Sequence, residues 1–209
     1  MFDFNIMHMI LGLPALVLAI VGHEYAHAQV AVWLGDDTPE REGRTSLNPL
    51  VHFDPVGTLA MFLVGIGWAK PVQVNPFNFR DPKKDELLVA LAGPFANLLM
   101  AFLAYVALAI LMVMDVELSR NAYQVILLIT LYNINFAIFN LLPIPPLDGS
   151  RIITAFMSWE ARMRMQQYQM ISLIVFLVII NTPIWSYIFR PIQGTILHAF
   201  QAIVNVFIG

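Results

Sequence analysis

The stretch that decides the fold runs from Met7 to Leu34 and reads MHMILGLPALVLAIVGHEYAHAQVAVWL. It is apolar over more than the roughly 20 residues that an α-helix needs to cross the hydrocarbon core of a membrane. Its second half nevertheless carries two histidines and a glutamate, in the motif HEYAH that begins at His23. Ionisable side chains are costly inside a membrane and are usually functional there. The stretch therefore predicts a membrane-spanning helix that carries a chemical site.

The composition indicates that the rest of the chain is membrane-embedded too. Of the 209 residues, 59% are hydrophobic and 12% are charged, whereas about a quarter of the residues in a soluble domain are charged. The chain has no cysteine, which excludes disulfides and thiolate metal sites and leaves histidines and carboxylates as strong ligands. A net charge of −3 gives no indication of nucleic acid as a partner. We expect a multi-pass protein whose surroundings are the lipid bilayer.

An all-α fold with four to five transmembrane helices is expected. The predicted spans are Met7–Leu34, Leu87–Met114, Ala122–Leu142, Ile171–Phe189 and Ile192–Ile208. The last stretch is shorter and carries polar residues, so a fifth span and a helix lying along the membrane surface both remain open. The length suits a single domain over residues 1–209, with a core at 7–152 and C-terminal helices at 169–208.

The basic residues predict the orientation of the chain. Of the 11 lysines and arginines, nine lie in the loops after the first and third spans, and two, Arg120 and Arg190, lie on the opposite side. Because basic loops stay in the cytoplasm, we expect the N-terminus outside the cell and the HEYAH end of the first span towards the cytoplasm. The membrane would be the inner (plasma) membrane.

The segment Thr58–Asn75 is apolar but lacks a helical pattern. It reads TLAMFLVGIGWAKPVQVN, in which Gly65, Gly67 and Pro71 interrupt the apolar run. The pieces LAMFLV and KPVQV are typical of strands. We expect a re-entrant β-hairpin between the first and second spans, since irregular backbone is tolerated in a membrane where protein or a wet cavity satisfies it.

The two histidines of the motif have the spacing of metal ligands. His23 and His27 are one helical turn apart, so both imidazoles can bind the same ion. Glu24 can reach a water molecule beside that ion without binding the ion itself. This H-E-x-x-H arrangement is that of zinc peptidases, in which the glutamate is the general base. The alternative, ordinary helix residues satisfied by their neighbours, is disfavoured by the cost of burying them in a membrane.

A catalytic zinc takes three protein ligands, so a third must come from elsewhere in the chain. Asp148, in the stretch NLLPIPPLDG, follows the third span and lies at the membrane depth of the histidines under the charge-based topology. The prolines of this stretch, Pro143, Pro145 and Pro146, prevent a regular helix. Asp148 could alternatively be a cap or turn residue, because Asp-Gly is a common turn pair, but the match in depth favours a ligand.

Three motifs together resemble those of the site-2 proteases, which are intramembrane zinc metalloproteases. They are HEYAH in the first span, AGPFAN at Ala92–Asn97 and NLLPIPPLDG at Asn140–Gly149. The stretches GRTSLNPLVHFDPVGT at Gly43–Thr58 and GWAKPVQVNPFNFR at Gly67–Arg80 are similar to those of small prokaryotic members that lack PDZ and CBS domains. The resemblance covers Gly22–Ile152.

The resemblance implies a zinc-dependent endopeptidase that hydrolyses a peptide bond within or near a transmembrane segment of a protein or peptide substrate. It implies one Zn²⁺ on His23, His27 and Asp148. It also implies that Glu24 is the catalytic acid and base.

The family pattern implies roles for four further residues. Asn140 would hold the substrate backbone or polarise the scissile carbonyl. Gly93, Pro94 and Asn97, in the second span, would shape the site where two helices approach closely.

The strand-like edge at Lys70–Asn75 indicates how a substrate could be held. An unwound peptide in a membrane needs new main-chain partners, which an exposed edge supplies by β-addition. We expect Val72 and Val74 to contribute to that edge. The alternative is a re-entrant plug that only packs the fold.

A metal-binding membrane transporter that uses the same His/Asp site is the rival function. A transporter has no need for Glu24 between the histidines, and the second and fourth spans offer few polar groups for a continuous path. Two further residues, His52 and Asp54, could bind metal or steer water near the cytoplasmic mouth of the protein. The favoured interpretation is that Asp54 caps a turn before Pro55 and His52 bonds a loop.

Overall fold

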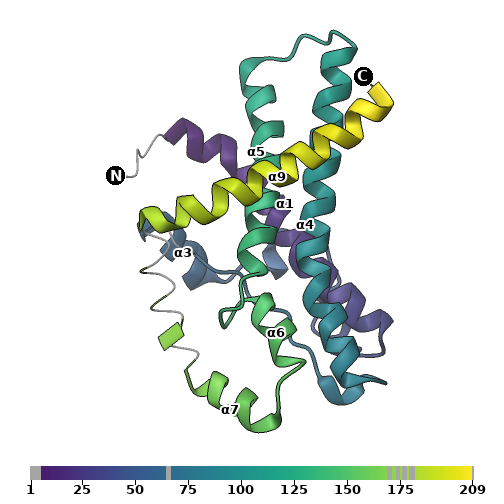
Figure 1. Ribbon diagram of the computed structural model, residues 1–209, viewed down its shortest axis with the longest axis vertical. Coiled ribbons are helices and arrows are strands. Elements are labelled where there is room, and N and C mark those ends of the chain that lie inside the picture. The colour runs from purple at the N-terminus through teal and green to yellow at the C-terminus, as the bar shows by residue number, and fades with distance from the viewer. Residues whose placement is uncertain are drawn as a thin grey trace.

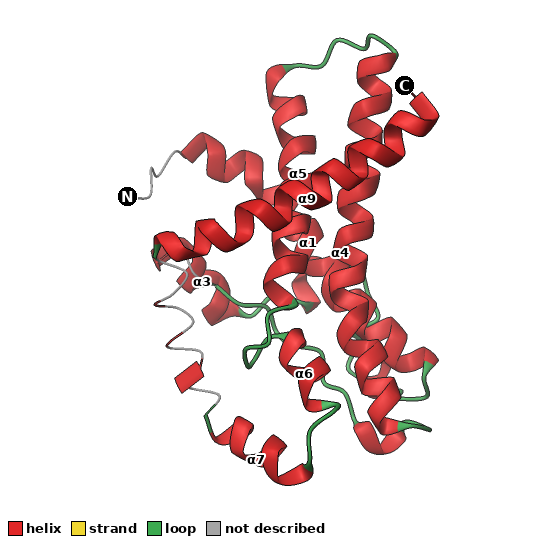
Figure 2. Cartoon of the chain, in the orientation of Figure 1, coloured by secondary structure: helices red, strands yellow, loops and turns green. Residues whose placement is uncertain are grey.

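The computed structural model describes residues 6–64, 67–168, 171–172, 175, 178 and 182–208, and its regular structure is helical (Figure 2). Among these residues, three helices are long and apolar enough to cross a membrane. They are α1 (Ile6–Trp33), α4 (Pro82–Val113) and α5 (Arg120–Asn140). The three pack against one another, and α4 and α5 run side by side along the long axis of the molecule (Figure 1). The protein is therefore a multi-pass membrane protein, and the first three predicted spans are confirmed.

Shorter elements connect and follow these helices. They are α2 (Thr38–Arg41), α3 (Pro55–Val64), α6 (Asp148–Thr154), α7 (Trp159–Gln167), α9 (Pro183–Ile208) and 3₁₀ turns at Pro49–Val51 and Pro76–Asn78. The loop that contains α2 and α3 joins α1 to α4, and α6 and α7 follow α5 at the lower end of the molecule in Figure 1.

Local capping sets the ends of the long helices. The side chain of Asp81 accepts a hydrogen bond from the main-chain N–H of Lys84 at 3.3 Å, and Pro82 occupies the first turn. Both features favour a helix start, so α4 begins before the predicted Leu87. The hydroxyl of Ser119 caps α5 in the same way, at 3.2 Å from the N–H of Ala122.

The segment between α3 and α4 differs from the predicted hairpin. The described residues contain no strand, and the prediction of a strand at Leu59–Val64 is wrong because these residues belong to α3. A short apolar run cannot be assigned by pattern alone. Here the side chain of Asp54 accepts a hydrogen bond from the N–H of Gly57 at 2.7 Å, and Pro55 opens the helix, so a helix start precedes the run.

The second half of the predicted hairpin has neither helix nor strand pairing. Lys70–Asn75 follows an isolated bridge between Phe53 and Ala69. Gly65, expected in the turn, lies outside the described residues. The segment nevertheless reaches the candidate functional site.

Helix α9 covers the end of the fourth predicted span and the whole of the fifth. Part of the stretch Ile171–Phe189 lies outside the described residues, but its end continues into Ile192–Ile208 as one helix, so the predicted break between them is wrong. A proline removes one helical hydrogen bond, and membrane helices tolerate this loss. Helix α9 continues through Pro191, whose carbonyl accepts a hydrogen bond from the hydroxyl of Thr195 at 2.9 Å. Helix α9 is not among the described helices that are long and apolar enough to cross a membrane.

One apolar cluster attaches α9 to the long helices. It joins one side of α9 to α4 and α5, and its buried members are Ala101, Ile134, Ile138, Phe189 and Phe200. The side chain of Gln193 adds a hydrogen bond to Asn135 of α5 at 2.8 Å. In Figure 1, α9 crosses α4 and α5 obliquely.

Candidate metal centre

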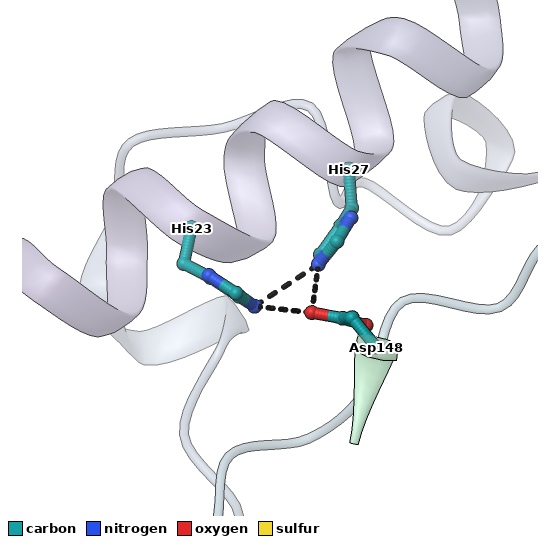
Figure 3. Close-up of side chains that lie close together, drawn as sticks. All are labelled: His23, His27 and Asp148. Atoms are coloured by element: carbon teal, nitrogen blue, oxygen red, sulfur yellow. Dashed lines mark hydrogen bonds and ion pairs between the residues drawn. The ribbon is translucent and has the colours of Figure 1, made fainter. Parts of the chain in front are cut away.

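Three potential ligands converge between α1 and α6. The Nε2 atoms of His23 and His27 each lie 3.0 Å from Oδ2 of Asp148 and 3.0 Å from each other (Figure 3). The histidines come from one face of α1 and the aspartate from the first residue of α6. Among the described residues, this is the group that could hold a metal ion.

Hydrogen bonds on the far side of each ring fix the orientation of the imidazoles. Nδ1 of His27 donates to the main-chain carbonyl of Val89 at 2.7 Å, since a carbonyl can only accept. Nδ1 of His23 lies 2.7 Å from Oδ1 of Asn97. The amide of Asn97 cannot be reversed, because its Nδ2 donates to the carbonyl of Ala19 at 2.9 Å. Both rings therefore carry their proton on Nδ1 and present Nε2 to the site.

Asn97 belongs to a buried polar chain that reaches α5. Its Nδ2 also donates to Oδ1 of Asn133 at 2.9 Å, and Nδ2 of Asn133 donates to the carbonyl of Ile129 at 2.9 Å. Both asparagine side chains are fully buried. Asn97, predicted to shape the site, thus bonds the ring of His23. Asn133 was not predicted, although a polar residue within an apolar span was a signal for it.

Gly93 allows α4 to pass directly against both imidazoles. A Cβ atom at this position would lie 2.4 Å from Nε2 of His27 and 2.6 Å from Cε1 of His23. Such contacts are shorter than any side chain tolerates, and the rings are held from behind. Pro94 is buried beside Gly93 in the same helix. Only glycine therefore fits where the helix faces the rings.

A tight reversal after α5 brings Asp148 to the histidines. Helix α5 ends at Asn140, before the three prolines of the stretch, and α6 starts at Asp148. A Cβ atom on Gly149 would lie 2.3 Å from the carbonyl oxygens of both Leu141 and Leu142. Glycine is thus required for the chain to fold back against the end of α5.

The donor set fits a zinc ion. In the tautomers described above, both Nε2 atoms and the carboxylate oxygen direct lone pairs at one another over 3.0 Å, an arrangement that a cation stabilises. Ligand atoms about 2.0–2.2 Å from a tetrahedral zinc are about 3.3–3.6 Å apart, so a small outward movement of the three ligand atoms would admit the ion. Two nitrogens and one carboxylate oxygen also match the ligand type of catalytic zinc sites.

Glu24 lies beside this group and contacts the unpaired segment, Lys70–Asn75, which forms neither helix nor strand. Its Oε2 accepts a hydrogen bond from the main-chain N–H of Val72 at 3.2 Å. Glu24 also lines a cavity of about 110 Å³ together with the three potential ligands. The segment expected to hold substrate and the residue expected to act as base are therefore in direct contact.

The same cavity contains other predicted site residues. Val72, Val74 and Asn140 line it. Nδ2 of Asn140 donates to the carbonyl of Phe136 in its own helix at 3.0 Å, and an amide has a second N–H and an oxygen to offer. Sequence reasoning thus named most of the residues that surround the cavity, apart from Arg151 and the Pro146–Leu147 turn.

Two buried charged residues hold the ends of the unpaired segment. Asp36, fully buried after α1, accepts hydrogen bonds from the N–H of Asn75 at 2.7 Å and from Nδ2 of Asn78 at 2.8 Å. At the other end, the buried guanidinium of Arg44 donates to the carbonyl oxygens of Val51 and Lys70. These contacts fix Lys70–Asn75 over the site, and no motif in the sequence predicts them.

The hydrogen bonds change the acidity of Asp36. Burial alone would raise the pKa of its carboxyl. The hydrogen bonds from Thr38, Asn75 and Asn78 outweigh burial and hold the pKa below its usual value.

His52 and Asp54 lie outside the potential metal group. Nε2 of His52 bonds the carbonyl of Ser46 at 2.6 Å, and Asp54 caps the start of α3 through Gly57. The carbonyl of His52 also accepts the N–H of Lys70 at 2.8 Å. Both residues therefore act in the loop, in agreement with the favoured interpretation.

Comparison with known proteins identifies relatives over most of the chain. The model of peptidase family M50 matches residues 11–182. The chain is 39% identical over 196 residues to a Bacillus subtilis protein named "Putative zinc metalloprotease YwhC", with 90% of each chain covered. It is 26% identical over 179 residues to "Putative zinc metalloprotease Rip2" of Mycolicibacterium smegmatis, covering 83% of this chain and 68% of that one. We found no solved structure that matches.

Proposed function

This chain belongs to peptidase family M50, the site-2 proteases, and is a zinc-dependent intramembrane metalloprotease, and we propose that His23, His27 and Asp148 hold its single Zn²⁺ with Glu24 as the catalytic acid and base. The convergence of three ligand atoms within 3.0 Å of one another carries this assignment. Family membership also decides against the rival function of a metal transporter.

The residues at the site have different roles in the reaction. When bound, zinc lowers the pKa of a water molecule to about 7 and polarises a carbonyl group. Glu24 takes the proton from the attacking water and returns it to the amine that leaves when the peptide bond breaks. Asn140 holds the substrate backbone or polarises the carbonyl with its second N–H, the first being donated to Phe136. Gly93, Pro94 and Asn97 shape the site: Gly93 leaves room for the two imidazoles, and Asn97 orients that of His23.

The unpaired segment supplies the contact to the substrate. A membrane protease acts on membrane-embedded substrates, and we assign to it a transmembrane protein or peptide that unwinds near the cleaved bond. Within the described part of the chain, no hydrogen bond engages the N–H of Gln73 or Val74. Both ends of Lys70–Asn75 are held, so the segment can pair with an unwound main chain by β-addition and loses little conformational entropy on binding. Pairing with the substrate in this way requires an unpaired main-chain edge but no preformed hairpin.

Residues 1–209 would form one domain in the inner (plasma) membrane, with four to five membrane helices. The N-terminus would lie outside and the metal centre towards the cytoplasm, as the basic loops favour. Helix α9, with 26 residues, is long enough to be the fourth span. A reporter inserted at exposed Glu42 tests the orientation, because it must report the cytoplasm. One fused after Gly209 tests the number of spans, and an external signal supports four.

The catalytic assignment is tested with purified full-length chain in lipid bilayers and an apolar transmembrane peptide. Glu24→Gln should keep its zinc and lose cleavage, since the ligands remain while the base is removed. Glu40→Gln, an exposed change on α2, is the matched control and should cleave normally. Cleavage by Glu24→Gln at a rate near that of the unmodified chain would refute the assignment.

A further inference from the structure

A second cavity adjoins the one that contains the metal centre. It has a volume of about 330 Å³, three times that of its neighbour at about 110 Å³, and falls in the size range of ligand pockets. The two cavities share four lining residues, Pro71, Val72, Val74 and Arg151. The larger cavity extends from this shared wall towards the start of α4 and towards α7, so it continues the path of a chain bound at the site.

Positive side chains outnumber negative ones around the larger cavity. Its charged lining residues are Glu86, Arg151 and Arg162. Arg162 forms an ion pair with Glu86, with 3.7 Å between Nη1 and Oε2. The side chain of Arg151 has no hydrogen bond or ion pair within the described residues. One arginine therefore remains without a partner at the wall that both cavities share.

Arg151 is positioned by the element that supplies a metal ligand. It lies one turn after Asp148 on α6, so its place relative to the metal centre is fixed by a short helix rather than by a flexible loop. A guanidinium offers planar, paired N–H donors that match a carboxylate. Its side chain is exposed at the cavity wall, so a peptide bound there can reach the guanidinium.

We propose that Arg151 forms a substrate subsite for a carboxylate, the side chain of an acidic residue a few positions from the cleaved bond. This inference rests on the proposed function, because it assumes that a peptide occupies both cavities. The carboxylate that cleavage creates is a second source of the same chemistry. Because Arg151 lines both cavities, the two sources are distinguished by where along the peptide the preferred carboxylate lies.

Binding of synthetic peptides tests the subsite without relying on cleavage. The peptides have one transmembrane length and a polar flank, through which a single Asp is moved position by position, and each has an Asn counterpart. Their dissociation constants are measured with the zinc-loaded full chain carrying Glu24→Gln in lipid nanodiscs. At one or two neighbouring positions, the Asp peptide should bind about tenfold more tightly than the Asn peptide.

Variants of the same protein identify the residue responsible. Adding Arg151→Gln should remove the preference for Asp, and Arg151→Glu should create a preference for a Lys peptide at the same position. Arg164→Gln removes the same charge from an exposed site on α7 outside both cavities and should keep the preference. Zinc content and thermal unfolding of each variant report whether it is folded.

Three results would overturn the subsite. They are the absence of an Asp preference at every position, its persistence in Arg151→Gln, and a preference confined to peptides that end in a free α-carboxylate over their amides. Cleavage by the chain with Glu24 intact is scored separately. Cleavage that depends on Glu24 but shows no Asp preference refutes the subsite alone, whereas an Asp preference that depends on Arg151 without any cleavage refutes the proposed function and leaves the subsite standing.

Discussion

The main-chain N–H of Val72 donates a hydrogen bond to the carboxylate of Glu24 at 3.2 Å. This bond joins the unpaired segment to the residue proposed as general base. It leaves the second carboxylate oxygen of Glu24 available for a water molecule. The position of the base therefore depends on a segment that Asp36 and Arg44 hold from either end.

Proline substitutions separate the two roles of this segment. Val72→Pro removes the N–H that holds Glu24, so we expect kcat to fall at least tenfold. Val74→Pro removes an N–H that has no partner in the described chain, so its loss should chiefly raise KM for the peptide. Steady-state kinetics with zinc analysis measure both effects. Normal kcat and KM in two folded, zinc-loaded variants would show that the segment neither holds the base nor binds substrate.

The ligand role of Asp148 can be distinguished from a turn role. Asp148→Ala should lower zinc occupancy and activity together, because a site with two remaining ligands binds the ion weakly. Asp54→Ala is the matched control, since Asp54 accepts a hydrogen bond from Gly57 at the start of α3 and lies outside the metal group. It should lose stability by about 1 kcal/mol and keep its zinc. Full zinc content in purified Asp148→Ala would exclude Asp148 as a ligand.

Two glycine substitutions test how closely α4 must approach the imidazoles. In Gly93→Ala, the added methyl group meets His27 and His23 at distances below 3.0 Å. We expect zinc affinity to fall about 10- to 100-fold, the range seen when the support of a ligand is disturbed. In Gly22→Ala, the methyl group meets the end of the flexible Met100 side chain, which can move away. Zinc titration should therefore show a normal affinity for Gly22→Ala, and equal affinities in the two variants would contradict the packing argument.

The hydrogen bond from His23 to Asn97 gives a further test. Asn97→Ala should lower zinc affinity about 10- to 100-fold, because the ring of His23 loses the partner that fixes its tautomer. Asn135→Ala removes the same amide from α5, where it pairs with Gln193 rather than with a ligand. Zinc affinity in that control should stay unchanged. A fall in thermal stability without a change in zinc affinity for Asn97→Ala would reduce its role to packing.

The sequence was sufficient for the parts that depend on local pattern. The lengths of the apolar runs predicted α1, α4 and α5, and the spacing of His23 and His27 predicted the convergence of their rings. The run Leu59–Val64 was assigned to the wrong element because it is too short for its period to be read. The roles of Asp36 and Arg44 were not predictable, since they depend on contacts with Asn75 and Lys70 far along the chain.

Asp36 makes the stability of the fold depend on pH. Its carboxylate accepts hydrogen bonds from Thr38, Asn75 and Asn78, which hold its pKa below the usual value. In the unfolded chain, the pKa of this group is about 4. A carboxyl whose pKa is lower in the folded state stabilises the fold fully above its unfolded pKa, and that contribution is lost as the pH falls through the folded pKa. The contribution of Asp36 should therefore be complete at pH 6 and decrease below about pH 4.

Asp36→Asn should remove this dependence and part of the stability. The amide keeps one acceptor oxygen but places an N–H₂ group against one of the donors, so we expect a loss of about 2 kcal/mol at pH 7. Asp37→Asn is the matched control, because Asp37 forms an exposed pair with Arg41 and such pairs contribute about 0–1 kcal/mol. Thermal unfolding in detergent is measured from pH 7 to pH 3. Between pH 5 and pH 3, the midpoint of Asp36→Asn should fall less than that of the unmodified chain and of Asp37→Asn. Parallel curves for all three proteins would show that the buried carboxylate does not hold the segment over the metal centre.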